Sequence, residues 1–201
     1  MYALVENNEI TKFINNPKSM VIGDVQYPAK IFQLWSSSEL EDKGIYEVVF
    51  NNSNKKDEQW YINTNQSFAF ADGAVTASYG TATPKAHADT LFTAQDETDG
   101  LGTEGEVATR GLKYNLIQTL KSQVANELAR TDWYITRNSE KSTAIPSAIS
   151  THRDAVRTKQ ASMETAITNA SDTPALETLY TYTTTDGVQS RPLGELPILE
   201  S

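Results

Sequence analysis

The chain has 201 residues, of which 38% are hydrophobic and 21% are charged, so it is polar but has the composition of a globular protein. The absence of cysteine excludes a disulfide scaffold, a thiolate metal site and cysteine catalysis. A net charge of −9 argues against general nucleic-acid binding, because phosphates would be repelled, and no apolar run is long enough to cross a bilayer.

Charge is distributed unevenly along the sequence. Residues 1–105 hold 15 acidic and 7 basic side chains, residues 106–171 hold 6 and 9, and residues 172–201 hold 5 and 1. The net charge therefore runs from −8 through +3 to −4, and the change of sign coincides with a change in hydrophobic pattern. We place the main boundary of the chain near residue 105.

The first part of the sequence is predicted to be rich in β-strands. Two short apolar runs flank Asn7 and Asn8, which predicts a β-hairpin because Asn tolerates the positive φ of tight turns. Residues 36–44 predict one short helix, with a serine N-cap at its start and a glycine at its end. A second hairpin is expected within residues 60–70. The predicted strands are residues 2–5, 10–14, 45–50, 60–62, 68–70 and 75–79.

Residues 86–106 have a different composition. From His87 to Glu106 there are six acidic side chains, three glycines and no lysine or arginine. This composition predicts a flexible acidic linker, with a short helical piece at residues 89–93. The alternative is a calcium loop, but the spacing does not match the twelve-residue pattern, because Ala108 stands where the bidentate glutamate belongs.

From residue 107 onward the hydrophobic pattern becomes helical. Apolar residues recur every four positions from Leu112 to Leu128, which predicts an amphipathic helix that packs against a crossing partner. A second long helix is predicted over residues 146–170, since proline suits its first turn and apolar side chains follow at seven-residue steps. Shorter helices are expected around Trp133 and over residues 174–180.

No sequence pattern points to a catalytic or cofactor site. The Gly-x-Ser-x-Gly turn of serine hydrolases, the phosphate-binding loop and the Gly-x-Gly-x-x-Gly fingerprint are all absent. The only two histidines, His87 and His152, are 65 residues apart, and we expect both on the surface rather than at a metal. Paired carboxylates such as Asp57 and Glu58 lie in polar turns without a pocket context. We therefore expect no enzyme activity, cofactor, metal or small-molecule ligand.

Four residues are candidates for a protein interface. Trp133 and Tyr134 are adjacent aromatic residues that either pack in the core between two helices or anchor an interface. Arg153 and Arg157 are four residues apart on one predicted helix, so they can grip a carboxylate such as Asp132, or stay solvated. Contact with nucleic acid is the alternative for these arginines, but no aromatic residues are interleaved with them.

A glycan-binding surface is a further alternative. Trp60, Tyr61 and Tyr79 are aromatic residues that can stack on sugars if they are exposed. Their alternation with polar residues also fits the ordinary faces of a β-sheet, so both interpretations stay open.

These patterns together predict an α+β fold. Residues 1–85 are expected to form a small antiparallel β module with one short helix, followed by the linker at 86–106. Residues 107–180 are expected to form a helical hairpin or bundle, because single amphipathic helices need a partner to cover their apolar stripes. Residues 181–201 contain two prolines and no periodicity, so we expect an extended tail that becomes ordered only against a partner.

Several segments of the sequence match one group of known proteins. They are YPAK at 27–30, SSELEDKGIYEV at 37–48, TDWYITR at 131–137, AIP at 144–146, HRDAVR at 152–157 and PALETLY at 174–180. In these segments and their order, residues 1–85 and 107–180 resemble small proteins encoded among the tail genes of tailed bacteriophages and prophages. The acidic segment 86–106 and the threonine-rich C-terminal tail depart from that pattern.

The resemblance implies a non-enzymatic structural part of a phage virion tail, associated with a fibre or the baseplate and made in the cytoplasm of the host bacterium. It implies other phage tail proteins as partners, no nucleic acid or membrane, and a homo-oligomer with a trimer favoured. Apolar side chains at Ile149, Val156 and Met163 permit an oligomer but are too few to establish a coiled coil. The alternative is a tail-fibre assembly chaperone that is absent from the mature virion.

Overall fold

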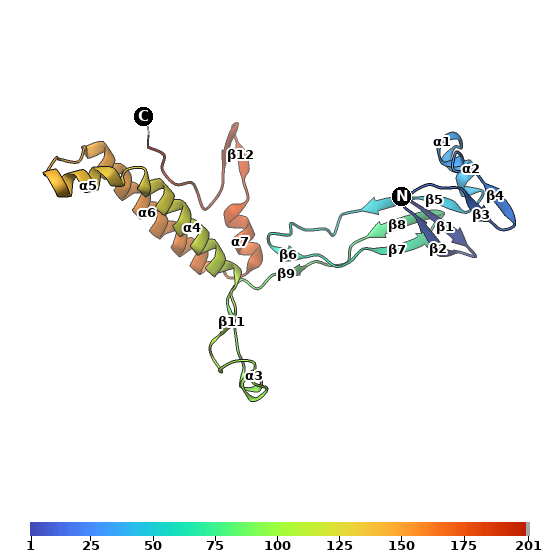
Figure 1. Ribbon diagram of the computed structural model, residues 1–201, viewed down its shortest axis with the longest axis horizontal. Coiled ribbons are helices and arrows are strands. Elements are labelled where there is room, and N and C mark those ends of the chain that lie inside the picture. The colour runs from blue at the N-terminus through green and yellow to red at the C-terminus, as the bar shows by residue number, and fades with distance from the viewer. Residues whose placement is uncertain (200–201) are drawn as a thin grey trace. The chain divides into compact units, whose positions relative to one another are not determined.

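The computed structural model describes residues 1–199 and divides the chain into two compact units (Figure 1). Unit 1 comprises Met1–Thr83, and unit 2 begins at Pro84. Helices and strands are both present, so the chain has an α+β fold, as the sequence predicts. The boundary falls well before the position near residue 105 that the charge pattern suggested, because the acidic segment 86–106 belongs to unit 2.

Unit 1 is built on a five-stranded sheet. The pairing of β5 with β8 is parallel, and the other three pairings are antiparallel. The sheet is therefore mixed, which corrects the expectation of an antiparallel module. Its strands are β1 (Tyr2–Glu6), β2 (Glu9–Ile14), β5 (Ile45–Asn51), β8 (Ala74–Ser78) and β7 (Ser67–Ala71), in the order β2-β1-β5-β8-β7. Two smaller sheets are formed by β3 (Met20–Ile22) with β4 (Val25–Tyr27), and by β6 (Tyr61–Ile62) with β9 (Thr83–Pro84).

Two hairpin turns of this sheet follow from the residues that form them. Asn7 and Asn8 have φ values of 52° and 64° between β1 and β2, so the first predicted hairpin is confirmed. Asp72 and Gly73 have φ values of 51° and 74° and join β7 to β8. The hairpin predicted within residues 60–70 is wrong, because this Asp-Gly turn pairs β7 with β8 instead of with β6.

Helix α2 (Ser37–Glu41) lies where the sequence predicts a short helix, and α1 (Ile31–Leu34) precedes it outside the predicted range. The Ser36 side chain accepts the Glu39 N–H, and the Glu39 carboxylate accepts the Ser36 N–H at 2.8 Å, which closes a capping box at the start of α2. Gly44 follows α2 with a φ of 76°, and a Cβ there would lie 2.5 Å from a carbonyl oxygen of β1. Only glycine allows this close approach.

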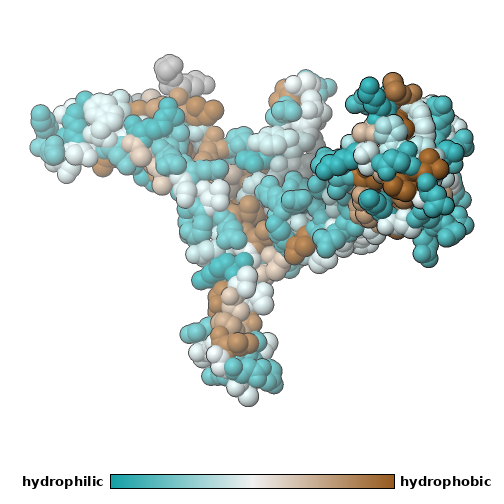
Figure 2. All heavy atoms as spheres, turned by 45° about the vertical axis from the view of Figure 1, so that its right-hand side comes forward, coloured by the Kyte–Doolittle hydropathy of each residue, from teal (hydrophilic) through white to brown (hydrophobic). Residues whose placement is uncertain are grey.

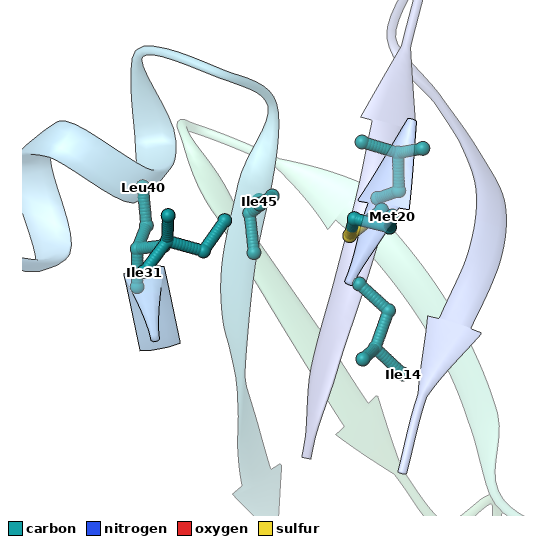
Figure 3. Packing of buried hydrophobic residues seen from close by; sticks show 6 residues of the cluster. Ile14, Met20, Ile31, Leu40 and Ile45 are labelled. Atoms are coloured by element: carbon teal, nitrogen blue, oxygen red, sulfur yellow. The ribbon is translucent and has the colours of Figure 1, made fainter. Parts of the chain in front are cut away.

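The two faces of the five-stranded sheet carry separate cores. On one face, Figure 3 shows Ile45 of β5 beside Ile31 and Leu40, which come from the two short helices. That core consists of Leu4, Ile14, Met20, Ile31, Leu40 and Ile45. The core of the opposite face consists of Ala3, Val5, Val48, Val75 and Ala77. Because side chains alternate along a strand, β1 and β5 contribute to both cores.

Unit 2 contains four helices of eight residues or more, and each lies where the sequence predicts a helix. They are α4 (Leu112–Ala129), α5 (Asp132–Lys141), α6 (Ser147–Asn169) and α7 (Thr173–Tyr180). Asp172 caps α7 by accepting the Ala175 N–H at 2.8 Å. Within residues 1–199, none of the helices combines the length and the apolar character that a membrane crossing requires.

Helices α4 and α6 pack along each other as a hairpin (Figure 1). The seven-residue stripe of α6 is buried at Ile149, Val156 and Met163, and α4 buries Leu120 and Val124. The α6 stripe is thus covered within the chain, whereas Leu112, Leu116 and Leu128 of the α4 stripe are only partly buried. The homo-oligomer stays a prediction.

Residues 86–106 are folded within unit 2, which corrects the expectation of a linker between domains. Together with the residues that follow, they form a projecting segment in which β10 pairs with β11. Its three short elements are β10 (Thr90–Leu91), α3 (Ala94–Thr98) and β11 (Val107–Thr109). Thr93 and Asp96 form a capping box at the start of α3, so the helix lies just after the piece predicted at residues 89–93. We name residues 89–110 the arm.

The base of the arm is held by one carboxylate. Asp89 accepts the Gly111 N–H at 2.7 Å and pairs with Arg110 at 2.6 Å. The backbone N–H of Gly111 and the guanidinium of Arg110 hold the pKa of Asp89 below its ordinary value. The arm therefore starts and ends at a defined position beside the first turn of α4.

The C-terminal tail is ordered by contacts within unit 2. β12 (Thr183–Thr185) and β13 (Val188–Ser190) form a hairpin. Leu193 is buried, its N–H donates to the Leu179 carbonyl oxygen at 3.0 Å, and its own carbonyl oxygen accepts Lys159 Nζ at 2.9 Å. The expectation of a wholly extended tail, ordered only by a partner, is therefore wrong up to residue 199. Residues 200–201 of the predicted tail lie outside the described residues.

Replacing Ile45 by alanine is expected to destabilise unit 1. Ile45 is fully buried, so the change removes apolar contacts and leaves a cavity, which costs about 2–4 kcal/mol of unfolding free energy. The matched control is Val49→Ala on the same strand, whose exposed side chain predicts a loss below about 0.5 kcal/mol. Urea unfolding followed by tryptophan fluorescence measures both variants. Equal losses for the two would contradict this packing.

Replacing Leu193 by serine is expected to release the tail, because the buried leucine holds it against α6 and α7. Limited proteolysis should then cut residues 181–199 about tenfold faster or more, while the helices stay protected. The control variant Val188→Ser changes an exposed side chain of the same segment and should leave the cleavage rate unchanged. Equal cleavage of the Leu193 variant and the unmodified chain would count against this contact.

Candidate functional site

The turn between α4 and α5 is organised around Arg153 of α6. Arg153 is buried, and its side chain is only 9% exposed. Its Nη1 donates to the Leu128 carbonyl oxygen at 2.8 Å and to the Thr131 hydroxyl at 2.7 Å, and it lies 2.8 Å from an Asp132 carboxylate oxygen. Asp132 is the carboxylate that the sequence suggested for an arginine of this helix. One cation therefore fastens the end of α4 and the start of α5 to the middle of α6.

His152 is buried beside Arg153 and is not the surface histidine that the sequence predicted. Its Nε2 lies 3.1 Å from a carboxylate oxygen of Glu127, which also pairs with Arg130 at 3.1 Å. Thr131 and the last turn of α4 are thus bound to α6 by two adjacent polar side chains, Arg153 and His152. The sequence contains no signal for this contact, because the side of a helix that faces its partner can be identified only once the crossing of the two helices is known.

Arg157 does not join Arg153 at a shared carboxylate. It is exposed and lies 3.4 Å from Asp154 on its own helix. An exposed pair of this kind contributes little to stability. Of the two alternatives for these arginines, the joint grip is not formed: Arg157 stays solvated, and of the two only Arg153 has a structural partner on another helix.

Trp133 and Tyr134 lie on α5, and none of the ten residues of that helix is buried. Trp133 is 51% exposed, so the interpretation as core packing does not hold for it. The two rings lie 3.8 Å apart between centroids, and the Arg137 guanidinium lies 4.7 Å from the Trp133 centroid and 5.3 Å from that of Tyr134. The interface role of this aromatic pair stays a prediction, and its exposure satisfies the first requirement of that role.

Two cations follow the exposed tryptophan on α5. Trp133, Arg137 and Lys141 lie at four-residue steps, which places them on one face of the helix. Arg137 Nε is buried without a hydrogen-bond partner, and within residues 1–199 no carboxylate pairs with Arg137 or Lys141. We name Trp133, Arg137 and Lys141 the α5 face. Sequence reasoning missed Arg137, although its distance of four residues from Trp133 is a signal for stacking.

Unit 1 offers a different aromatic surface. Phe13 of β2 and Phe68 of β7 form a tilted ring pair with centroids 4.6 Å apart, and both are exposed, as is Phe50 of β5. By contrast, Trp60 and Tyr61 are buried, which removes two of the three aromatic side chains suggested for glycan binding. Sequence reasoning placed the phenylalanines in strands but did not identify their exposure.

Across the part of the chain that the structure describes, no three His, Asp or Glu side chains gather as a metal site requires.

Replacing Arg153 by methionine is expected to lower the unfolding free energy of unit 2 by about 2–3 kcal/mol, because the Thr131 hydroxyl, the Leu128 carbonyl and Asp132 lose their common partner. The matched control is Arg157→Met, which removes an exposed pair on the same helix and should cost less than about 0.5 kcal/mol. Thermal unfolding followed by the helical circular dichroism signal compares them. A control variant as unstable as the Arg153 variant would contradict the anchoring role.

The chain was compared with protein-family models, with curated proteins and with solved structures, and none of these comparisons found a match.

Proposed function

We propose that this chain is a non-enzymatic structural protein that connects other proteins through two separately folded units. The observation that carries this proposal is that each unit has its own buried core and presents large aromatic side chains to solvent. Half-exposed aromatic residues are a frequent feature of interface hot spots, because they bury a large area at a low cost in side-chain entropy.

In unit 1 the exposed aromatic surface lies on the sheet. Phe13, Phe50 and Phe68 all belong to strands of the five-stranded sheet and border its second core. Rings that are held by a sheet are already oriented for a partner, so little conformational entropy is lost on binding. We assign this surface to the docking of unit 1.

In unit 2 the α5 face serves the same purpose with a different chemistry. Trp133 supplies the apolar contact, and Arg137 and Lys141 supply unpaired cations beside it. Arg153 holds the start of α5 in place from behind. A partner of this face therefore needs an apolar side chain with carboxylates around it.

The setting that we propose is the tail of a bacteriophage virion, with assembly in the host cytoplasm. This rests on the resemblance of residues 1–85 and 107–180 to phage tail-region proteins. The partners are then other tail proteins of a fibre or of the baseplate, together with further copies of this chain. The segment 86–106 has no part in the reach between the units, because it is folded within unit 2.

Mass spectrometry of density-purified particles of the phage that encodes this chain tests the proposal. We expect the unmodified chain at a ratio to a known tail protein that reflects a threefold or sixfold symmetric position. Trp133→Ala should reduce incorporation by about tenfold or more, since tryptophan hot spots are costly to truncate.

The control for this experiment is Leu34→Ala, which changes a more exposed apolar side chain outside both proposed surfaces. It should be incorporated normally. A chain that is abundant in the lysate but absent from particles would overturn the structural role and favour a fibre-assembly chaperone instead.

A further inference from the structure

The arm of unit 2 exposes apolar side chains among carboxylates. Leu101 at its tip is 64% exposed, and Leu91 and Val107 are also exposed. Figure 2 shows hydrophobic residues along the arm, next to hydrophilic residues at its end. Between residues 89 and 109 there is no lysine or arginine, and the acidic residues are Asp89, Asp96, Glu97, Asp99, Glu104 and Glu106.

The arm is folded well enough to present this surface. The Leu101 N–H donates to the Asp96 carbonyl oxygen at 2.8 Å, and the Gly105 N–H donates to the Phe92 carbonyl oxygen at 3.0 Å. A side chain at Gly102 would collide with the Phe92 ring, so the ring packs directly on the backbone beside Leu101. The loop that carries the exposed Leu101 is therefore fixed by backbone hydrogen bonds and by the packing of the Phe92 ring.

The α5 face is complementary to the arm in both charge and polarity. The half-exposed ring of Trp133 on α5 matches the exposed Leu101 of the arm. The cations of Arg137 and Lys141, which pair with no carboxylate within residues 1–199, match the carboxylates of the arm. Asp99 and Glu104 lie on either side of Leu101 in the sequence, and Arg137 and Lys141 follow Trp133 by one and two turns of the helix. Opposite charges around an apolar contact fix the orientation of a complex and speed its formation.

One copy of the chain cannot join these two surfaces. The arm leaves the chain at the first turn of α4, and α5 begins after its last turn, so the 18 residues of α4 separate them by about 27 Å. The arm also extends away from the α4–α6 hairpin (Figure 1). A contact between the arm and α5 has to form between two copies.

We propose that the arm of one copy docks on the α5 face of a second copy, with Leu101 against Trp133 and the flanking carboxylates against Arg137 and Lys141. This inference rests on the proposed role of the α5 face as a protein interface and names its partner. The contact is heterologous, because each copy contributes a different surface. A pair joined by one such contact keeps one free arm and one free α5 face, so the contact builds a closed ring of two or more copies, or a filament.

Sedimentation velocity of the full chain over a range of concentrations tests the contact. We expect self-association at about 50 mM salt that weakens at about 500 mM salt, since the charges of both surfaces are exposed and screened. Leu101→Ser on the arm and Arg137→Glu on α5 should each raise the dissociation constant by about tenfold or more. Lys141→Glu is a second α5 variant at an exposed residue, and it should act in the same direction.

Val188→Ser is the matched control, because it removes an exposed apolar side chain from unit 2 outside both surfaces. It should associate like the unmodified chain. Circular dichroism melts of all variants confirm that each is folded, so that a loss of association reports on the surface itself.

Mixing two variants gives the sharpest test. The Leu101→Ser chain keeps a working α5 face, and the Arg137→Glu chain keeps a working arm. Each alone should be monomeric, whereas the mixture should form dimers that grow no further. A monomeric wild-type chain at low salt, unchanged association of the variants, or a mixture that stays monomeric would each overturn the inference. If Trp133→Ala still reduces incorporation into particles in that case, the proposed function stands and only the identity of the partner is wrong.

Discussion

The buried guanidinium of Arg153 determines where α5 lies, and the interaction surface of unit 2 depends on that position. No residue of α5 is buried, so apolar packing cannot hold the helix in place. The hydrogen bonds from Arg153 to the Leu128 carbonyl and the Thr131 hydroxyl, with the ion pair to Asp132, fix the turn that precedes it. Removing this one cation would break all three of these links between α6 and the turn, and for that reason the contact specifies a single geometry. The exposure of Trp133 follows from that geometry.

The way in which each unit covers its own apolar side chains decides which surfaces remain for partners. The α4–α6 hairpin buries the stripe of Ile149, Val156 and Met163, so a coiled-coil seam is not available to a second copy. What remains in unit 2 is a face with one tryptophan and two cations, and an arm with exposed leucines and carboxylates. Contacts of this kind depend on salt and orientation more than an apolar seam does. In unit 1 both faces of the sheet are used by cores, and the remaining aromatic side chains lie at the border of one of them.

Features that depend on neighbours in the sequence were predicted well. The Asn7-Asn8 turn, the serine cap of α2 and the four longer helices of unit 2 rest on local hydrogen bonds and on hydrophobic periodicity. The arm was misread as a linker, because acidic and glycine-rich composition is typical of disordered segments. Its order comes from the Thr93 cap and from the bonds that Asp89 makes to Gly111 and Arg110, which become visible only when both ends of the arm meet. The tail was misread for a related reason, since the burial of Leu193 depends on α6 and α7.

The sequence by itself determined the α+β class, most of the helices and the turn residues, and it placed Trp133, Tyr134 and Arg153 among the candidate interface residues. The tertiary structure alone decided that β5 pairs in parallel with β8, that His152 and Arg153 point inward, and that Arg157 and Trp133 point to solvent. The physical reason is that period and capping are set within a few residues, whereas strand order and the side of a helix that faces a partner depend on contacts between distant segments. Burial of a charged or aromatic side chain is therefore a property of the packed chain.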